Sequence, residues 1–200
     1  MTNQYRMARA AFLDRDGVIN LDRAYVHRWA DFAFVPGALA AMHRLHQAGY
    51  RLVVVTNQSG IARGYFDEAQ FQVLTAQMLD AFEQSGIHGV AVYHCPHHPA
   101  GRVQPLAIDC ECRKPAPGMI LLAARELGLS LSDSFLVGDK PSDIHAARAA
   151  NLGRAFLVAS DNEESTPECA QADAVFRDLA ECVDALLSGA LLANASREAN

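Results

Sequence analysis

The sequence predicts an α/β fold: a Rossmann-like, three-layer arrangement in which a parallel sheet lies between helices. Short apolar, β-branched runs alternate along the chain with segments whose apolar residues recur at helical spacing. The chain has 200 residues, half of them apolar, which is enough for one domain with a sizeable core. We expect a single domain over residues 1–200, with its core over about 8–187 and a flexible tail over 188–200.

Composition excludes several classes of partner. The formal net charge is −6 and no long run of Lys or Arg occurs, so we expect no nucleic-acid surface. No stretch approaches the length of a membrane span, and the N-terminus has no signal-peptide apolar region. These features indicate a cytoplasmic protein with no membrane partner, and a monomer in the absence of any separate dimerisation element.

The expected strands are short runs rich in β-branched and aromatic residues, bounded by turn residues. They are Ala8–Leu13, Arg51–Thr56, Val90–Tyr93, Ser134–Val137, Ala155–Val158 and a short strand around Val175. Because strands alternate with helices, the strands should be parallel and joined by right-handed crossovers.

The expected helices have apolar residues three and four positions apart, with capping residues at their ends. They are Ala38–Gln47, a helix from its N-cap Asp67 through Phe82, Gly118–Leu127, Ser142–Asn151 and Asp178–Leu187. Three segments lack any periodicity and are expected to be loops: 18–35, 94–117 and 160–170. Residues 57–60 should break the second strand.

A pair of aspartates directly follows the first strand. Asp14 and Asp16 lie two positions apart and are followed by Gly17, which predicts a tight turn at the carboxyl edge of the sheet. Two carboxylates there are costly unless a cation is bound, and Mg²⁺ suits oxygen ligands. The pair by itself also fits an ordinary turn or a helix N-cap.

Two other strands deliver complementary groups to the same edge. Thr56 and Asn57 end the second strand, and Asp139 ends the fourth, with Asp143 four residues later. The loop over 94–117 brings Lys114 just ahead of a helix. Carboxylates together with a lysine indicate a cation and a phosphoryl group bound side by side. An aspartate can then attack phosphorus, while a second one transfers protons to the leaving alkoxide and from water.

The cysteines cluster in the loop over 94–117. Cys95 and His97 are followed, after twelve residues, by Cys110 and Cys112. Three thiols and one imidazole suit a closed, tetrahedral and structural Zn²⁺ site that would staple a zinc loop over residues 94–115. His94 and His98 are rival ligands, and a pair of buried thiols without metal is the simpler alternative. Cys169 and Cys182 are expected to be free.

Taken in order, these motifs resemble the haloacid dehalogenase (HAD) superfamily. The resemblance rests on Asp14-x-Asp16-Gly17, the strand-ending Thr56, Lys114 before a helix, and Gly138-Asp139 with Asp143, and it covers about residues 8–187. It implies a HAD-like fold in which Asp14 is the nucleophile and Asp16 the general acid and base. Thr56 and Lys114 would bind the transferring phosphoryl group, and Mg²⁺ would be held by Asp14, the Asp16 backbone carbonyl and Asp139. Asp143 would support the site or cap the helix, and direct metal ligation by Asp143 is the less favoured alternative.

Four stretches are similar to a narrower family, the D-glycero-D-manno-heptose-1,7-bisphosphate phosphatases. They are residues 13–17 (LDRDG), 56–64 (TNQSGIARG), 93–99 (YHCPHHP) and 110–115 (CECRKP). That resemblance implies removal of the C7 phosphate in ADP- or GDP-heptose synthesis for lipopolysaccharide or surface glycans. The phosphatase half of the bifunctional histidine-biosynthesis enzyme looks similar too, so histidinol-phosphate phosphatase is the alternative. A non-catalytic phospho-ligand module and a zinc-loop adaptor are alternatives from another class.

Neither gap between the motifs has room for a separate cap domain, so loops must hold the substrate. The resemblance implies substrate contacts from Asp22, Arg23, Ala24, Tyr25, Thr56, Asn57, Gln58, Ser59, Arg113, Lys114 and Lys140. The planar guanidinium of Arg113, beside Lys114, is the expected donor to the C1 phosphate. The alternatives are a surface ion pair of Arg113 with Glu111, and a Lys140 that orients Asp14 or Asp139 instead of binding substrate.

Overall fold

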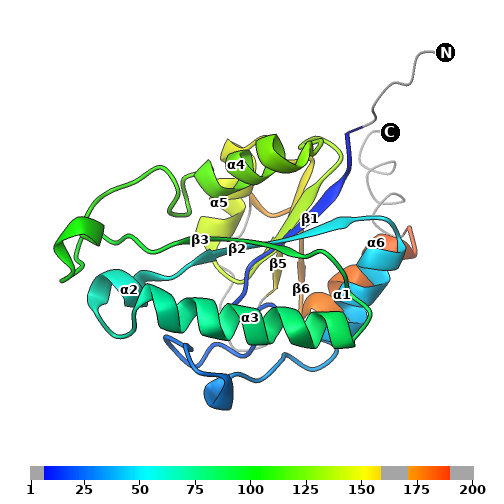
Figure 1. The fold of residues 1–200 in the computed structure, drawn as a ribbon. Coiled ribbons are helices and arrows are strands. Elements are labelled where there is room, and N and C mark those ends of the chain that lie inside the picture. The colour runs from blue at the N-terminus through cyan, green and yellow to red at the C-terminus, as the bar shows by residue number, and fades with distance from the viewer. Residues whose placement is uncertain (1–6, 159–170, 190–200) are drawn as a thin grey trace.

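The computed structural model describes residues 7–158 and 171–189. Six parallel strands form one sheet, in the order β3-β2-β1-β4-β5-β6 (Figure 1). The strands are β1 Ala10–Leu13, β2 Arg51–Asn57, β3 Ala91–Cys95, β4 Phe135–Gly138, β5 Arg154–Val158 and β6 Ala174–Phe176. The predicted α/β fold with a parallel sheet is therefore confirmed.

Six α-helices lie within the described residues, five between strands and α6 after the last strand: α1 Ala38–Gln47, α2 Ser59–Arg63, α3 Glu68–Gln84, α4 Gly118–Leu127, α5 Pro141–Ala149 and α6 Leu179–Leu187. Two short 3-10 turns, Trp29–Asp31 and Gln104–Leu106, lie in the loops. The predicted helices agree with these bounds to within a few residues. The helix α2 was not expected, because five residues are too few to show a helical period. The expected loop 160–170, Cys169 and most of the expected tail fall outside the described residues.

The sheet is covered on both faces. Figure 1 shows α4 and α5 on one face, and α1, α3 and α6 on the other. The residues of β1 alternate between the two cores: Ala11 and Leu13 belong to the core under α1, α3 and α6, whereas Ala10 and Phe12 belong to the core under α4 and α5. This alternation follows from the two-residue period of a strand. None of the helices in the described ranges has the length and apolar character that a bilayer-spanning segment requires.

The position of β1 decides where a ligand can bind. Chain order runs outward from β1 to β2 and β3 on one side, and to β4, β5 and β6 on the other. The direction of winding therefore reverses between β1 and β4. Open parallel sheets bind ligands at such a switch point, outside the carboxyl ends of the strands.

Candidate active site

The central contact of the site is a buried lysine between two carboxylates. Asp14 follows β1 and is 6% exposed, while Lys114, from the loop before α4, is 4% exposed. Lys114 Nζ lies 2.5 Å from Asp14 Oδ1, 2.5 Å from Asp143 Oδ1 and 2.7 Å from the Val55 carbonyl oxygen. The ammonium donates hydrogen bonds to Asp14 and to the Val55 carbonyl oxygen, and it forms an ion pair with Asp143.

Burial governs the protonation of this cluster. Burial raises the pKa of Asp14 to about 7; the charge of Lys114 opposes the shift, and the neighbouring Asp143 and Asp139 add to it. Burial likewise raises the pKa of Asp139 to about 6. Burial alone would lower the pKa of Lys114, but the carboxylates of Asp14 and Asp143 outweigh it and raise that pKa above its ordinary value. The lysine is therefore charged, and Asp14 and Asp139 lack enough neighbouring positive charge to be fully ionised near neutral pH.

The carboxylates fit a divalent cation. One oxygen each from Asp14, Asp139 and Asp143 lies within 4.8 Å of the others. Asp139 Oδ1 is buried and has no hydrogen-bond partner among the described residues, which suits a metal ligand. Asp143 is already engaged, since its Oδ1 pairs with Lys114 and its Oδ2 accepts the Lys140 backbone N–H at 3.0 Å at the start of α5. This arrangement suits a supporting, helix-capping role for Asp143.

The carboxylate of Asp16 is held from three sides. Its Oδ1 accepts from Asn20 Nδ2 at 2.9 Å, and its Oδ2 accepts from Gln58 Nε2 at 3.1 Å. The guanidinium of Arg15 approaches both oxygens, at 3.0 and 2.9 Å. Gln58 Nε2 also donates to Thr56 Oγ1 at 2.8 Å, so the same amide links the two predicted catalytic side chains. The roles of Arg15 and Asn20 were not predicted, because neither lies at a position that the strand-end pattern singles out.

The side chain of Asn57 holds the main chain of Lys114. Asn57 Nδ2 donates to the Lys114 carbonyl oxygen at 3.0 Å, and Asn57 Oδ1 accepts from the Lys114 N–H at 3.1 Å. Lys140, from the turn after β4, lies 3.2 Å from both Asp139 Oδ2 and Asp22 Oδ2. In the described contacts Lys140 thus reaches a site carboxylate and the expected substrate loop at once.

The expected substrate loop has an unusual backbone. Asp22 Oδ1 accepts from the Ala24 N–H at 3.0 Å, and Ala24 and Tyr25 both have positive φ, 55° and 56°. Left-handed conformations cost energy for residues other than glycine and are commonly retained at binding sites. The Tyr25 ring meets the Tyr65 ring edge-to-face at 4.7 Å. Arg23 donates to the Asp31 carbonyl oxygen at 3.4 Å.

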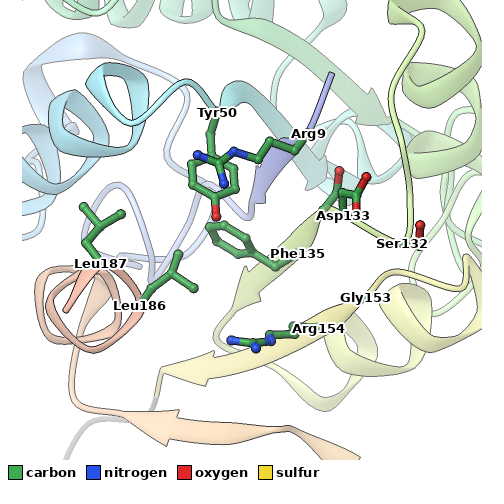
Figure 2. A pocket seen from close by; sticks show the side chains of 10 residues that line it. Arg9, Tyr50, Ser132, Asp133, Phe135, Gly153, Arg154, Leu186 and Leu187 are labelled. Atoms are coloured by element: carbon green, nitrogen blue, oxygen red, sulfur yellow. The ribbon is translucent and has the colours of Figure 1, made fainter. Parts of the chain in front are cut away.

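A small cavity brings together all four predicted catalytic residues. It has a volume of about 50 Å³ and is lined by Asp14, Asp16, Thr56, Asn57, Lys114, Lys140, Ser142 and Asp143. The other expected substrate contacts, Asp22–Tyr25, Gln58, Ser59 and Arg113, do not line it. A larger cavity of about 490 Å³ lies at the opposite edge of the sheet, where Arg9, Phe135 and Arg154 mark the amino ends of strands (Figure 2). It contains none of the predicted site residues.

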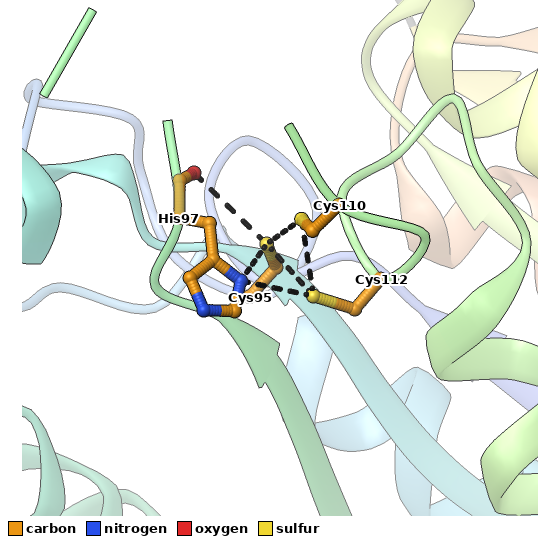
Figure 3. A group of neighbouring side chains, drawn as sticks. All are labelled: Cys95, His97, Cys110 and Cys112. Atoms are coloured by element: carbon orange, nitrogen blue, oxygen red, sulfur yellow. Dashed lines mark hydrogen bonds between the residues drawn. The ribbon is translucent and has the colours of Figure 1, made fainter. Parts of the chain in front are cut away.

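Cys95, His97, Cys110 and Cys112 converge in one group (Figure 3). The contacts between their Sγ atoms are 3.2, 3.3 and 3.5 Å long, and His97 Nδ1 lies 3.3 Å from Cys112 Sγ and 3.8 Å from Cys95 Sγ. These distances are far too long for disulfides. Sulfur ligands in a tetrahedron around Zn²⁺, with Zn–S bonds of about 2.3 Å, lie roughly 3.8 Å apart, so the group needs only a small expansion to hold that ion.

The rival histidines are engaged elsewhere. His94 Nε2 pairs with Glu68 at 2.9 Å, and His98 Nε2 lies 3.0 Å from the Arg63 guanidinium. Arg113, next to Cys112, donates to the His97 carbonyl oxygen at 3.3 Å and forms no ion pair with Glu111 within the described residues. Two of the clustered cysteines, Cys110 and Cys112, and the basic pair Arg113-Lys114 are therefore parts of one short segment.

Comparisons with known proteins agree with this site. A HAD-hydrolase-like family model matches residues 111–182. The D-glycero-beta-D-manno-heptose-1,7-bisphosphate 7-phosphatase of Escherichia coli K12 is 47% identical over 178 residues, which cover 88% of this chain and 93% of that protein. The D-glycero-alpha-D-manno-heptose-1,7-bisphosphate 7-phosphatase of Photorhabdus laumondii is 42% identical over 164 residues, or 82% of this chain and 90% of that one.

A solved structure gives the same result for the fold. The D,D-heptose 1,7-bisphosphate phosphatase from B. bronchiseptica, complexed with magnesium and phosphate, superimposes with a TM-score of 0.75 at 35% sequence identity. The match covers 90% of this chain and 98% of that one. At these identities and coverages, the chain belongs to the family of heptose-1,7-bisphosphate 7-phosphatases, within the HAD-like hydrolases.

Proposed function

We propose that the protein is a Mg²⁺-dependent phosphatase that hydrolyses the C7 phosphate of D-glycero-D-manno-heptose 1,7-bisphosphate and leaves heptose 1-phosphate. The observation that carries the proposal is the placement of Asp14 beside the charged Lys114, with Asp16 facing the same cavity. The names of the curated relatives support the substrate. The reaction is a two-step transfer through an aspartyl-phosphate.

In the first step, a carboxylate oxygen of Asp14 forms a bond to phosphorus. The bond between phosphorus and the C7 oxygen breaks, and its electron pair stays on that oxygen. Protonated Asp16 gives its proton to the departing alkoxide, which leaves as the free C7 hydroxyl. Lys114 and the Thr56 hydroxyl hold the phosphoryl oxygens while charge moves across them.

In the second step, a water molecule attacks the phosphorus of the aspartyl-phosphate. The Asp16 carboxylate takes the proton of that water, so Asp16 returns to its starting form. The bond from phosphorus to the Asp14 oxygen breaks, which restores the Asp14 carboxylate and releases inorganic phosphate.

Two metals complete the proposal. Asp14, Asp139 and the Asp16 backbone carbonyl would hold Mg²⁺, which supplies the charge that lets a phosphate dianion approach the Asp14 carboxylate. Cys95, His97, Cys110 and Cys112 would hold a structural Zn²⁺. Because Cys112 directly precedes Arg113 and Lys114, that ion would fix the segment from which both basic residues reach the substrate.

The substrate would be held by loops, with no separate cap domain. Arg113 would bind the C1 phosphate, and Asp22–Tyr25, Asn57, Gln58, Ser59 and Lys140 would contact the sugar and its phosphates. We further propose that the enzyme works as a monomeric, single-domain protein in the cytoplasm, in ADP- or GDP-heptose synthesis for lipopolysaccharide or surface glycans.

The test is phosphate release with Mg²⁺ from both anomers of the heptose bisphosphate and from histidinol phosphate, assayed in parallel. We expect kcat/KM for the preferred heptose anomer to exceed that for histidinol phosphate by at least about 100-fold, because only the bisphosphate offers a second anion to Arg113. A preference for histidinol phosphate would overturn the substrate. Full activity in Asp14→Asn would overturn the role of Asp14 as nucleophile. Wild-type protein that binds the phosphosugar but does not hydrolyse it would be a non-catalytic binding module.

A further inference from the structure

The side chain of Arg15 is buried beneath the active site and is the largest fully buried side chain in the described part of the chain, at 1% exposure. A buried guanidinium is costly, and a well-packed apolar side chain of similar volume is often as stabilising or more so. Its Nε and Nη1 atoms have no hydrogen-bond partner among the described residues, and only Nη2 is engaged. Stability alone does not explain this arginine.

The single engaged nitrogen joins three parts of the site. It lies 3.0 and 2.9 Å from the two carboxylate oxygens of Asp16, 2.9 Å from the Val26 carbonyl oxygen and 3.4 Å from Gln58 Oε1. Val26 is buried and directly follows the loop over Asp22–Tyr25. The Arg15 guanidinium carbon lies 5.9 Å from the centre of the Phe71 ring, which backs it from α3. The Asp16 carboxylate is thus tied to the backbone of the substrate loop through one arginine.

We propose that Arg15 is a positioning residue for proton transfer: it fixes the Asp16 carboxylate in line with the leaving oxygen and links that orientation to the loop over residues 22–26. The Asp16 side chain is 18% exposed, whereas that of Arg15 is 1% exposed, so Arg15 can serve as the fixed partner that holds the Asp16 carboxylate. Lysine cannot replace the arginine fully, because the rigid, planar guanidinium holds its nitrogen in a fixed position, whereas the ammonium of lysine ends a flexible four-carbon chain. This inference rests on the proposed function, in which Asp16 protonates an alkoxide.

Leaving-group chemistry separates this role from a merely structural one. The C7 alkoxide of the sugar is a poor leaving group and needs the proton from Asp16, whereas p-nitrophenolate and acetate leave without one. The ratio kcat/KM reports steps up to the first irreversible one, here the loss of the leaving group. It therefore excludes the later hydrolysis of the aspartyl-phosphate, which is common to all substrates. A change in the folded fraction would lower kcat/KM for every substrate equally.

The experiment compares Arg15→Met and Arg15→Lys with wild type on the heptose bisphosphate, p-nitrophenyl phosphate and acetyl phosphate. For Arg15→Met we expect kcat/KM to fall by about 100-fold on the heptose bisphosphate but by less than about threefold on the two activated phosphates. Arg15→Lys should lie between Arg15→Met and wild type. The matched control is Arg148→Met, which removes an arginine that pairs with Asp173 away from the site. It should leave kcat/KM on the heptose bisphosphate, relative to kcat/KM on the activated phosphates, unchanged.

Each outcome is decisive. Equal losses on all three substrates, or no loss on the sugar, would overturn the positioning role of Arg15 and leave the proposed function intact. If wild type hydrolyses histidinol phosphate instead of the heptose bisphosphate, histidinol phosphate, which is also a primary alkyl phosphate, replaces the heptose in the comparison with the two activated phosphates. Failure of wild type on every alkyl phosphate would overturn the proposed function, and the inference about Arg15 with it.

Discussion

Asn57 and Lys114 exchange two hydrogen bonds, at 3.0 and 3.1 Å, between the side-chain amide of the first residue and the main chain of the second. They join the end of β2 to the loop that precedes α4. Both the donor and the acceptor of the amide are used, so Asn57 fixes the position and the rotation of the Lys114 peptide. The Lys114 ammonium, 2.5 Å from Asp14 Oδ1, depends on that anchor.

Asn57→Ala should lower activity by way of Lys114. We expect kcat/KM to fall roughly 10- to 100-fold, because a misplaced ammonium no longer offsets the repulsion between Asp14 and the substrate phosphate. A double-mutant cycle with Lys114→Met measures the coupling. If Asn57 acts through the lysine, Asn57→Ala has little further effect in the Lys114→Met background, whereas additive losses would indicate an independent contact with substrate.

Gly17→Ala should weaken Mg²⁺ binding. Gly17 has φ of +89°, and an added Cβ would lie 2.3 Å from Asp139 Oδ2, so the Asp139 carboxylate would have to move. We expect the Mg²⁺ concentration for half-maximal activity to rise by about tenfold or more. Gly49→Ala is the matched control, since Gly49 has φ of +83° but no atom within 4 Å of the added Cβ.

Gly17→Ala and Gly49→Ala should each lower the free energy of unfolding by about 1 kcal/mol because of backbone strain, as measured by denaturant titration. Only Gly17→Ala should change the Mg²⁺ requirement. An unchanged requirement in Gly17→Ala would show that Asp139 is not a metal ligand.

The Mg²⁺ requirement should increase as the pH falls. The pKa values of Asp14 and Asp139, about 7 and about 6, lie above those of ordinary aspartates because of burial, and Mg²⁺ binds only the ionised carboxylates. Between pH 8 and pH 6 the ionised fraction of Asp14 falls about tenfold and that of Asp139 about twofold, so the half-saturating Mg²⁺ concentration should rise roughly 20-fold. Activity at saturating Mg²⁺, measured at each pH, separates this effect from changes in kcat. A requirement that stays constant over this range would contradict the account.

Loss of zinc should disable the segment that carries Lys114. Elemental analysis should find about one zinc ion per chain in wild type and almost none in Cys112→Ala. We expect Cys112→Ala to lower the melting temperature by several degrees and kcat/KM by at least about tenfold, because Arg113 and Lys114 follow directly. Cys182→Ala, which removes a buried thiol of α6 outside the cluster, should keep its zinc. Full activity in zinc-free protein would refute the stapling role.

The sequence was sufficient to predict the edge of the sheet at which the site lies. Asp14 and Asp139 directly follow β1 and β4, and Thr56 lies one residue before the end of β2. Parallel strands bring such ends together regardless of loop detail. The Cys-x-His and Cys-x-Cys spacing likewise specified one compact group, now seen within 4.8 Å. These signals are local patterns whose geometry depends on little else.

Contacts that depend on side-chain direction could not be predicted in the same way. Arg15 lies between two aspartates in the sequence, where a solvated charge would be the ordinary expectation, yet the turn at Gly17 directs it inward to Asp16 and Val26. The helix α2 is stabilised by packing of Ile61 against Phe66 and Phe71, a tertiary effect that five residues cannot signal. Asn57 is paired with a backbone 57 residues away, so its partner is visible only in the fold.

The most direct test of the central claim is the position of hydrolysis, followed by phosphorus NMR during turnover of the heptose 1,7-bisphosphate by the wild-type protein with Mg²⁺. We expect the signal of the C7 phosphate to disappear, inorganic phosphate to appear in equal amount, and the C1 phosphate to persist, bound in place by Arg113 while Asp14 attacks the other end. Loss of the C1 phosphate first, or of both phosphates at equal rates, would contradict the proposed orientation of the substrate and with it the assigned function.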